Sequence, residues 1–482
     1  MKSDIIIIGG GLGGLTAGAK LAKEGKKVLL IEQHDRPGGC ATTFKRKSFT
    51  FEVGLHEMDG LDRRDMKTRI FHDLGVFDKV RFLKVPEFYH FINGRYEITI
   101  PHDPEEAIKV LKENFPEEES GIDAYFDQIL NARKKAKEST GDAERSLGEF
   151  LDSIINNEDL KLILLGNLGY FHDDPYSISL NYYSIAQGSY FQGGGNYIKG
   201  GSQKLSDYLS GYISQNGGKV ILKHLVTEII TENSKAVGVR YQKIGNKASE
   251  SYEEYGKEII ANASIPQVAY QLLPKEHGER IQQKIENLEV GASLLTIYIG
   301  FKKKAKAMGS QYYSTFVYDE SIKTQSDIKN NNKGDFNDRS FTFIDYSQID
   351  SALTTGDKSV GVICCIDYFS DWDKLNKEEY KAKKKQVGDI FIDRLEKLVP
   401  GIKDHIAYFE VGTSKTVARY TLNPEGAVYG FSQTPRRITL DEIQSIDNLH
   451  FASAWTKIGG GFSGAIFSGY LCALDILRKG RQ

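Results

Sequence analysis

The first thirty-two residues constrain the fold of this chain more than any other stretch. Four isoleucines, residues 5–8, lead into the glycine-rich segment 9–14, and a helical pattern follows. A second apolar run, residues 28–31, ends at Glu32. An apolar run that ends in glycine is typical of a strand buried on both faces of a parallel sheet. The stretch therefore predicts a strand–turn–helix–strand unit.

The glycines of this unit fit the pattern G-x-G-x-x-G at Gly9, Gly11 and Gly14. The first glycine allows a tight turn, the second lets the backbone approach a pyrophosphate, and the third lets the helix pack closely on the strand. Glu32 is placed to bind a ribose hydroxyl, and an acid at this position disfavours a 2′-phosphate. The pattern predicts a Rossmann-like unit that binds FAD or NAD rather than NADP, with the helix N-terminus facing the phosphates.

Length and composition exclude several classes of protein. A chain of 482 residues exceeds one ordinary core, so two domains are expected. The 63 Lys and Arg nearly balance the 65 Asp and Glu, so no nucleic-acid partner is expected. No two histidines have metal-ligand spacing on one element, and the four cysteines have neither metal-site nor disulfide spacing, so no metal is expected.

The same features bear on location. No apolar run approaches the ~18 residues that span a bilayer, and the chain enters its first strand without room for a signal peptide. With cysteines that suit a reducing compartment, a cytoplasmic protein is expected, with peripheral membrane association left open.

A second glycine pair, Gly38-Gly39, follows six residues beyond Glu32. Backbone can approach a ligand closely there, and the hydroxyls of Thr42 and Thr43 could donate to it. A purely structural turn is an equally open interpretation.

The run 38–44 (Gly-Gly-Cys-Ala-Thr-Thr-Phe), followed by 51–56 (Phe-Glu-Val-Gly-Leu-His), resembles the N-terminal signature of the phytoene desaturase superfamily of FAD enzymes. The retinol saturase and carotenoid isomerase branch is most similar, because it carries a similar Gly-Gly-Cys segment and a Val/Thr-Gly-x-His turn. The resemblance implies non-covalent FAD rather than NAD. It would place segment 32–39 around the adenosine ribose and pyrophosphate, and the turn 54–56 near the isoalloxazine ring.

The resemblance also implies the other contacts to FAD. In the family, the residue matching Val226 contacts the adenine through its backbone, and the last helix, after the glycines at 459–461, points at the flavin pyrimidine. Ser453-Ala454 replaces an acidic residue that many members hold against the ribityl chain. The implied cofactor-binding residues are Gly9, Gly11, Leu12, Gly14, Glu32, Gln33, Gly38, Gly39, Cys40, Thr42, Thr43, Gly54, Leu55, His56, Val226, Asn262, Ser453, Ala454, Gly460, Gly461, Phe462 and Ser463.

The predicted fold class is α/β, with a Rossmann-like FAD domain of the glutathione-reductase type and an inserted α+β substrate domain. The Asn93-Gly94 turn predicts a hairpin, Asp103 before Pro104 predicts a helix start, and residues 330–334 are predicted to form a polar loop. The FAD domain is expected to comprise 1–75, 192–290 and 431–482, and the substrate domain 76–191 and 291–430.

The leading hypothesis is an FAD-dependent oxidoreductase that desaturates, saturates or isomerises a carotenoid, retinoid or similar apolar isoprenoid by hydride transfer at flavin N5. The electron partner, whether quinone, oxygen or a reductase, is left open. His56 and Glu57 are the candidate acid or base, because family position places them beside the flavin. It is equally open that His56 only contacts the flavin or supports the turn.

Two further hypotheses remain. One keeps the flavin but changes the substrate, as in an amine oxidase-like enzyme or an isomerase or reductase of unsaturated fatty acids. The other is a non-enzymatic protein like the Rab GDP-dissociation inhibitors, which share this architecture and bind prenylated proteins. It predicts a colourless protein, whereas Glu32 and the three glycine-rich segments favour retained FAD.

Overall fold

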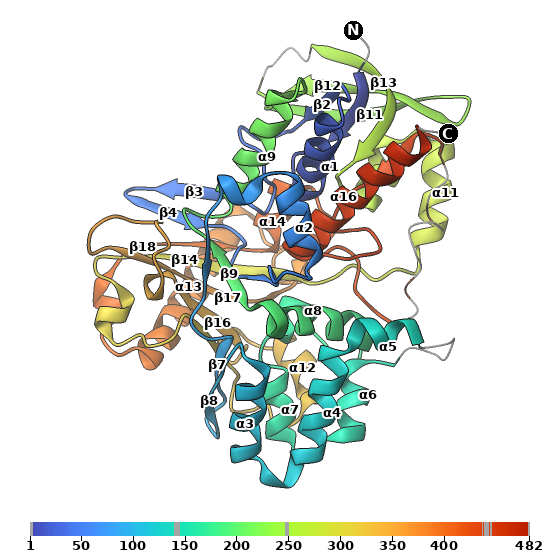
Figure 1. Cartoon of the computed structure of the whole chain (residues 1–482). Coiled ribbons are helices and arrows are strands. Elements are labelled where there is room, and N and C mark those ends of the chain that lie inside the picture. The colour runs from blue at the N-terminus through green and yellow to red at the C-terminus, as the bar shows by residue number, and fades with distance from the viewer. Residues whose placement is uncertain are drawn as a thin grey trace.

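Two large sheets, each of seven strands in the described residues, organise the chain. Figure 1 shows the first sheet with both termini at the top of the view, and helices α3 to α8 at the bottom. This computed structural model describes residues 3–138, 145–245, 250–435, 437, 443 and 446–480.

The isoleucine run forms β1 (Ser3–Ile8), which pairs in parallel with β2 on one side and β13 on the other. Ile6 and Ile7 are fully buried, because helices and further strands cover both faces of the sheet. The predicted buried strand is thus confirmed. The sheet order is β10 (Lys219–Ile221), β2 (Val28–Ile31), β1, β13 (Ser251–Ala261), β12 (Lys235–Lys243) and β11 (His224–Glu232), with β19 (Leu449–Phe451) parallel to β13.

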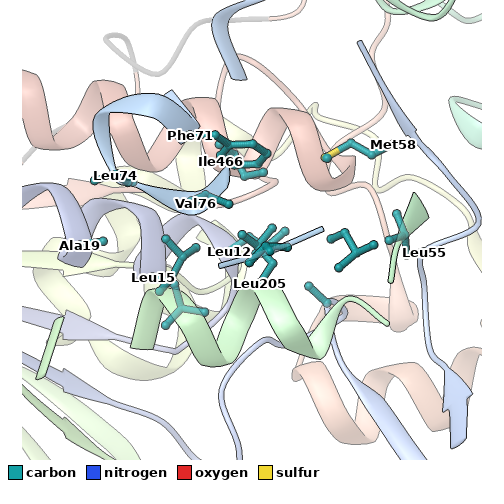
Figure 2. Close-up of a cluster of buried hydrophobic side chains, with 14 of the residues drawn as sticks. Leu12, Leu15, Ala19, Leu55, Met58, Phe71, Leu74, Val76, Leu205 and Ile466 are labelled. Carbon is teal, nitrogen blue, oxygen red and sulfur yellow. The ribbon is translucent and has the colours of Figure 1, made fainter. Parts of the chain in front are cut away.

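Helices pack against this sheet through a shared apolar cluster. Leu12 and Leu15 meet Leu205, Phe71 and Ile466 in Figure 2. A Cβ added to the glycine at 469 would lie 2.1 Å from the carbonyl oxygen of the glycine at 13, so two helices cross where neither has a side chain. The helices that contribute are α1 (Leu12–Lys23), α2 (Met66–Asp73), α9 (Gln203–Gln215) and α16 (Gly461–Lys479).

The second sheet is antiparallel except for one parallel pair, β15 with β7. Leu295, Ile297 and Ile299 point to one face of the sheet, where α13 (Lys377–Leu398) covers them. The alternate residues of the same strand face the other way. The order is β18 (Ile406–Gly412), β14 (Ser293–Phe301), β17 (Ser359–Asp367), β16 (Phe341–Asp345), β15 (Ser314–Val317), β7 (Tyr89–Ile92) and β8 (Glu97–Ile100).

A group of helices packs beside β7 and β15 around its own apolar cluster. The hairpin at Asn93-Gly94 and the helix start at Asp103, whose carboxylate caps the helix, are confirmed. These helices are α3 (Pro104–Asn114), α4 (Glu119–Leu130), α5 (Ala132–Glu138), α6 (Leu147–Ile154), α7 (Glu158–Leu164) and α8 (Leu180–Gly193).

Smaller sheets and short helices connect the two large sheets and the group of helices. The strand β6 (Phe82–Lys84) belongs to the predicted substrate segment 76–191, yet it pairs with β9 (Gly195–Ile198), from the predicted FAD segment. The exact division into domains therefore stays a prediction. The small sheets contain β3 (Thr43–Arg46) with β4 (Phe49–Glu52), and β5 (Met58–Asp59) with β9 (Gly195–Ile198) and β6 (Phe82–Lys84). The remaining short helices named here are α10 (Ile265–Gln267), α11 (Lys275–Ile285), α12 (Ile328–Lys333) and α14 (Ser414–Thr421).

The expectation of a polar loop over residues 330–334 was wrong, because most of this segment belongs to α12. Thr324 and Asp327 form a capping box that starts a helical turn directly before α12. Asparagines and lysine can therefore continue a helix whose start is fixed by its preceding turn.

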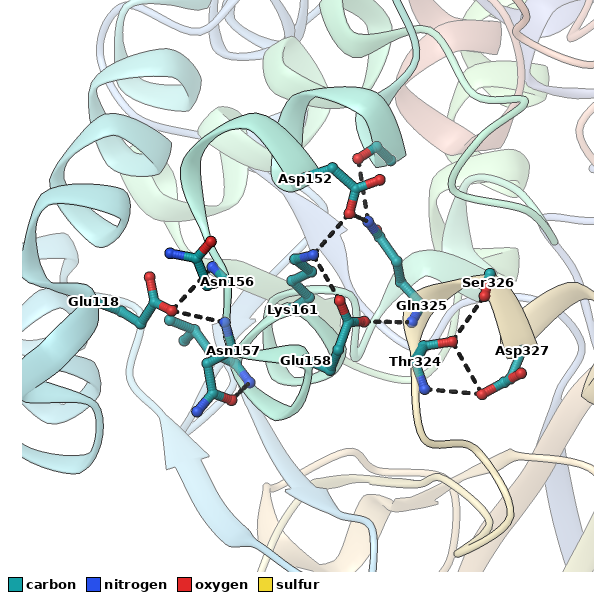
Figure 3. A network of polar contacts seen from close by, with 12 residues as sticks. Glu118, Asp152, Asn156, Asn157, Glu158, Lys161, Thr324, Gln325, Ser326 and Asp327 are labelled. Atoms are coloured by element: carbon teal, nitrogen blue, oxygen red, sulfur yellow. Dashed lines mark hydrogen bonds and ion pairs between the residues drawn. The ribbon is translucent and has the colours of Figure 1, made fainter.

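A polar network holds the start of this helical segment against α6 and α7 (Figure 3). The ammonium of Lys161 lies 2.7 Å from carboxylate oxygens of both Asp152 and Glu158. Gln325 donates through its side chain to Asp152 at 2.7 Å and through its backbone to Glu158 at 3.1 Å. Because Lys161 is buried, this network fixes the position of α12 against the helices.

Within the described ranges, no helix is long and apolar enough to cross a membrane.

Candidate functional site

A cavity of about 690 Å³ begins at the carboxyl ends of the first sheet and extends between the second sheet and the helices. Ile8, Asn262 and Ser453 line it, directly at or after the ends of β1, β13 and β19. Ligands of open α/β sheets bind at such carboxyl ends. The cavity therefore joins the predicted nucleotide site to the predicted substrate region.

The three glycine-rich segments meet on the wall of this cavity. Gly38 pairs with Gly11 in a parallel bridge, and its N–H donates to the carbonyl of Gly10 at 2.7 Å. Gly460 and Gly461 line the same cavity at the start of α16. Segments separated by more than 400 residues thus converge around one space.

The glycine backbone leaves room that side chains would fill. Gly9 has φ +90°, and a Cβ there would lie 2.5 Å from the carbonyl oxygen of Asn262. Gly38 has φ +130°, and a Cβ there would lie 2.3 Å from the carbonyl oxygen of Ala41. Helices α1 and α16 both begin without a side-chain cap or an acid in the first turn, so their N–H groups are available to anionic groups. These features fit the phosphates and pyrimidine of FAD.

Glu32 lies buried at the nucleotide end of the cavity. Its carboxylate accepts from the N–H of Gly10 at 2.6 Å and from the N–H of His34 at 2.8 Å. A carboxylate has about four lone-pair sites, so acceptor capacity remains for a ribose hydroxyl. Gln33 and Val226 line the same end, as the resemblance implies.

Four residues of the predicted cofactor set do not line the cavity. Gly14 packs under β1, where a Cβ would lie 2.4 Å from the carbonyl oxygen of Gly9. The hydroxyl of Thr42 donates to Gln203, and Thr43 pairs with β4. Leu55 is buried, and its carbonyl accepts from Tyr346 at 2.9 Å. The structure gives these residues supporting roles. The remaining predicted residues lie on the wall: Gly9, Gly11, Leu12, Glu32, Gln33, Gly38, Gly39, Cys40, Gly54, His56, Val226, Asn262, Ser453, Ala454, Gly460, Gly461, Phe462 and Ser463.

A residue that sequence reasoning missed holds the turn that leads to His56. Glu52 is 1% exposed, and its carboxylate accepts from the N–H groups of Val53 at 3.1 Å and Leu55 at 3.3 Å. It also accepts from the hydroxyl of Ser202 at 2.6 Å and the N–H of Ser202 at 2.7 Å. An acid at the end of a strand and directly before a glycine turn was the available sequence signal.

His56 lies on the cavity wall with its Nδ1 3.1 Å from the hydroxyl of Tyr170. Burial lowers the pKa of His56 to about 4 and raises that of Tyr170 well above its usual value. Both groups are therefore neutral at pH 7, and Nδ1 and the Tyr170 hydroxyl share a hydrogen bond whose donor depends on the imidazole tautomer.

Glu57 is 8% exposed, and neither carboxyl oxygen has a hydrogen-bond partner among the residues that the structure describes. The carboxyl group packs against Gly195, where a Cβ would lie 1.9 Å from Oε2. Burial, with further contributions from Glu87 and Asp59, raises the pKa of Glu57 well above its usual value. Glu57 is therefore a neutral acid beside the cavity.

Asp59 shows the opposite behaviour two residues later. Burial alone would raise its pKa, but Lys67 and the hydroxyl of Ser463 outweigh burial and lower the pKa of Asp59. At pH 7 Glu57 is therefore neutral and Asp59 is negatively charged, although both lie on the same wall. Active sites often hold two carboxyl groups in different protonation states in this way.

The second sheet supplies the far wall of the cavity. Phe316, Thr342, Cys364 and Thr296 stand directly opposite one another across β15, β16, β17 and β14, and all four line the cavity. Thr342 and Cys364, in the middle of this row, have small side chains that leave the space in front of the sheet open. Aromatic side chains line the remainder: Tyr170, Phe171, Tyr182, Tyr190, Tyr298, Tyr318 and Tyr429.

Of the aromatic run 182–191, Tyr182 and Tyr190 line the cavity, whereas Tyr183 and Phe191 belong to the helical core. From α12, Ile328 and Asn332 also reach the wall. Helical periodicity divides one aromatic segment between core and cavity.

Among the residues that the structure describes, no group of three or more His, Cys, Asp or Glu side chains could hold a metal ion.

Known proteins are similar to this chain over nearly its whole length. Residues 12–477 match the family described as flavin containing amine oxidoreductase. The chain is 27% identical to an all-trans-retinol 13,14-reductase of Danio rerio, with 99% of this chain and 86% of that protein covered. It is 27% identical to a chloroplastic prolycopene isomerase of Daucus carota, with 98% and 79% covered.

Solved structures resemble the fold. An oxidoreductase from Methanosarcina mazei has a TM-score of 0.67 at 14% identity, with 98% of this chain and 100% of that chain covered. Cyclohexylamine oxidase from Brevibacterium oxydans has a TM-score of 0.64 at 16% identity, with both chains fully covered. At such identities the similarity shows the fold alone.

Proposed function

Because the chain belongs to the flavin-containing amine oxidoreductase family and is an FAD-dependent oxidoreductase of the phytoene desaturase superfamily, we propose that it acts on carbon–carbon double bonds of an apolar polyene. Saturation and isomerisation are the favoured directions, since the similar proteins are named for a retinol and a prolycopene. When bound, FAD supplies hydride transfer at N5.

The continuity of the cavity carries this proposal. Residues that fit FAD and the apolar row of the second sheet border one space, so a long apolar molecule can lie against the cofactor. The row from Phe316 to Thr296 carries no charged side chain. This chamber supports an apolar substrate over a charged amine.

Saturating a double bond adds one hydride and one proton, so the protein must supply the proton. We assign this role to Glu57, because it is neutral, buried and beside the cavity. Since its carboxyl group makes no hydrogen bond within the described part of the chain, none is lost there when the side chain turns toward the cavity. His56, held by Tyr170, keeps the wall in place and excludes water.

Anaerobic spectra of the purified, FAD-loaded protein test the substrate class. We expect photoreduced protein to regain the visible flavin bands when all-trans-retinol is added, or to isomerise prolycopene while its flavin stays reduced. The contrary result would identify an amine oxidase. In that case the flavin of the oxidised protein would bleach with putrescine or cyclohexylamine, and the reduced protein would react with neither polyene. A colourless protein that cannot be loaded with FAD would overturn the whole proposal.

Replacing Cys364 by phenylalanine should separate substrate binding from FAD binding. Cys364 lies in the middle of the apolar row, so a larger ring would fill the chamber while the nucleotide end stays unchanged. We expect all-trans-retinol to bind at least about tenfold more weakly at equal FAD content, since blocking burial of a few methylene groups suffices. Fluorescence titration measures both, and Cys364→Ser, which keeps the volume, should bind retinol normally. Normal retinol binding by Cys364→Phe would exclude this chamber.

Access from a lipid surface is also part of the proposal. Ile185, 37% exposed, and the exposed Arg133 line the cavity where it reaches the surface, and α5 carries three further lysines among its seven residues. Cationic side chains near an apolar opening suit an anionic bilayer. We expect co-sedimentation with vesicles that contain phosphatidylserine, reduced in Ile185→Asp. Equal sedimentation of both proteins would contradict this route.

A further inference from the structure

A buried ionic cluster lies beside the N-terminus of α16. The ammonium of Lys67, whose side chain is 0% exposed, lies 2.9 Å from Oδ2 of Asp59 and 3.2 Å from Oδ2 of Asp65. The hydroxyl of Ser463, in the first turn of α16, donates to the other oxygen of Asp59. The cluster therefore joins β5, α2 and α16.

The two carboxylates of the cluster, Asp59 and Asp65, have different roles. Asp65 caps α2, accepts from the backbone N–H of Lys67 at 2.6 Å, and accepts from the hydroxyl of Ser189 at 3.2 Å. Asp59 reaches the cavity wall, as does Ser463. Only one of the two negative charges therefore borders the space that fits FAD.

The electrostatic potential of this wall combines three contributions. The N-terminus of α16 is positive, because no side chain of the described residues caps it and its first turn has no acid. The carboxylate of Asp59 opposes this potential, and the ammonium of Lys67 restores part of it. The nearby Glu57 adds no charge while it is neutral.

We propose that Asp59 and Lys67 set the electron affinity of the bound flavin, by adjusting the potential that the α16 N-terminus presents to the isoalloxazine ring. The carboxylate disfavours the extra negative charge of the reduced flavin, and the ammonium favours it. Both are positioning residues. The proposal requires FAD in the cavity with its ring at α16, but it is independent of the substrate.

Equilibration of the FAD-loaded protein with a reference redox dye tests this proposal. In Asp59→Asn, the equilibrium constant for flavin reduction should rise about tenfold, because an isosteric amide removes a unit charge at close range. In Lys67→Met the constant should fall by a similar factor. The double variant Asp59→Asn/Lys67→Met should return close to the original value, because it removes one charge of each sign, and Asp65 keeps its hydrogen bonds from the Lys67 backbone and Ser189.

Asp73→Asn is the matched control. Asp73 lies at the other end of α2, pairs with Lys20 at 3.0 Å and Lys23 at 2.6 Å, and does not line the cavity. Its variant should leave the dye equilibrium unchanged. If Asp59→Asn and the double variant both bind FAD and neither constant differs from the original, the proposal is wrong. If Asp59→Asn shifts and the double variant shifts equally, Lys67 has no such role. Failure of the unmodified protein to bind FAD would reject the cofactor site on which the proposal rests.

Discussion

Replacing Glu57 by glutamine is expected to lower the turnover of all-trans-retinol by about 100-fold or more, while FAD stays bound. Glutamine keeps the shape and neutrality of the buried side chain but has no proton to transfer. A positioned general acid contributes about 10²–10⁴-fold to rate. The measurement is single-turnover oxidation of photoreduced protein by retinol, followed in the visible flavin bands.

The proton-donor role of Glu57 also predicts how turnover changes with pH. Because burial raises the pKa of Glu57 well above its usual value, the acid form persists at neutral pH, and activity should fall only as pH rises through the raised pKa. The neutral carboxyl also stabilises the fold most below its unfolded pKa, and this contribution is lost as pH rises through the folded value. Glu57→Gln should lack both effects.

Glu87→Gln provides the control for that experiment. Glu87 lies close enough to Glu57 to influence its pKa but does not line the cavity, and it accepts from the N–H groups of Tyr313 and Ser314. Glu87→Gln should turn over retinol at a rate within a few-fold of that of the unmodified protein. Full activity in Glu57→Gln, or equal losses in both variants, would remove Glu57 from the chemistry.

The nucleotide half of the site was predictable from sequence because its signals are local. Gly9 and Gly38 adopt positive φ values, and the run at 5–8 forms a buried strand. In both cases the residue type itself predicts the local backbone conformation or burial. Family resemblance then supplied the distant segment at 460–461. Which of the wall residues contact FAD remains a prediction.

The substrate half was not predictable, because long-range register determines it. Thr342, Cys364 and Thr296 form one wall only since three strands pair in a particular alignment. The ion pair of Asp59 with Lys67 depends on where α2 docks, and Ser202, which donates to Glu52, lies 150 residues further along the chain. Pairings of this kind leave no periodic pattern in the sequence.

The short helix α12 shows the same limit at a smaller scale. Residues 330–334 contain asparagine, lysine and glycine, whose composition favours a loop. The preceding turn, held by Gln325 against Asp152 and Glu158, starts the helix instead. Tertiary contacts outweighed local propensity there.

Replacing Glu52 by alanine is expected to destabilise the protein by about 4 kcal/mol and to release FAD. The carboxylate is 1% exposed and accepts from buried donors of Leu55 and Ser202, so its removal leaves both backbone N–H groups unpaired. The N–H of Val53 also donates to the carbonyl of Thr42 and keeps that partner. Each unpaired buried donor costs about 1–3 kcal/mol, reduced where the backbone can shift. The turn to His56 would lose its support, and the wall beside the flavin would change shape.

Thermal unfolding and flavin release, followed together, measure this effect. Ser202→Ala is the graded control, because it removes only the hydroxyl that donates at 2.6 Å and keeps the backbone donor and the carboxylate. Its cost should be about 1 kcal/mol, with FAD retained. Glu52→Gln should fall between the two, since one amide oxygen can still accept while the amide nitrogen meets another donor. If Glu52→Ala unfolds at the original temperature and keeps FAD, the donors of this turn find other partners, and Glu52 does not hold the wall.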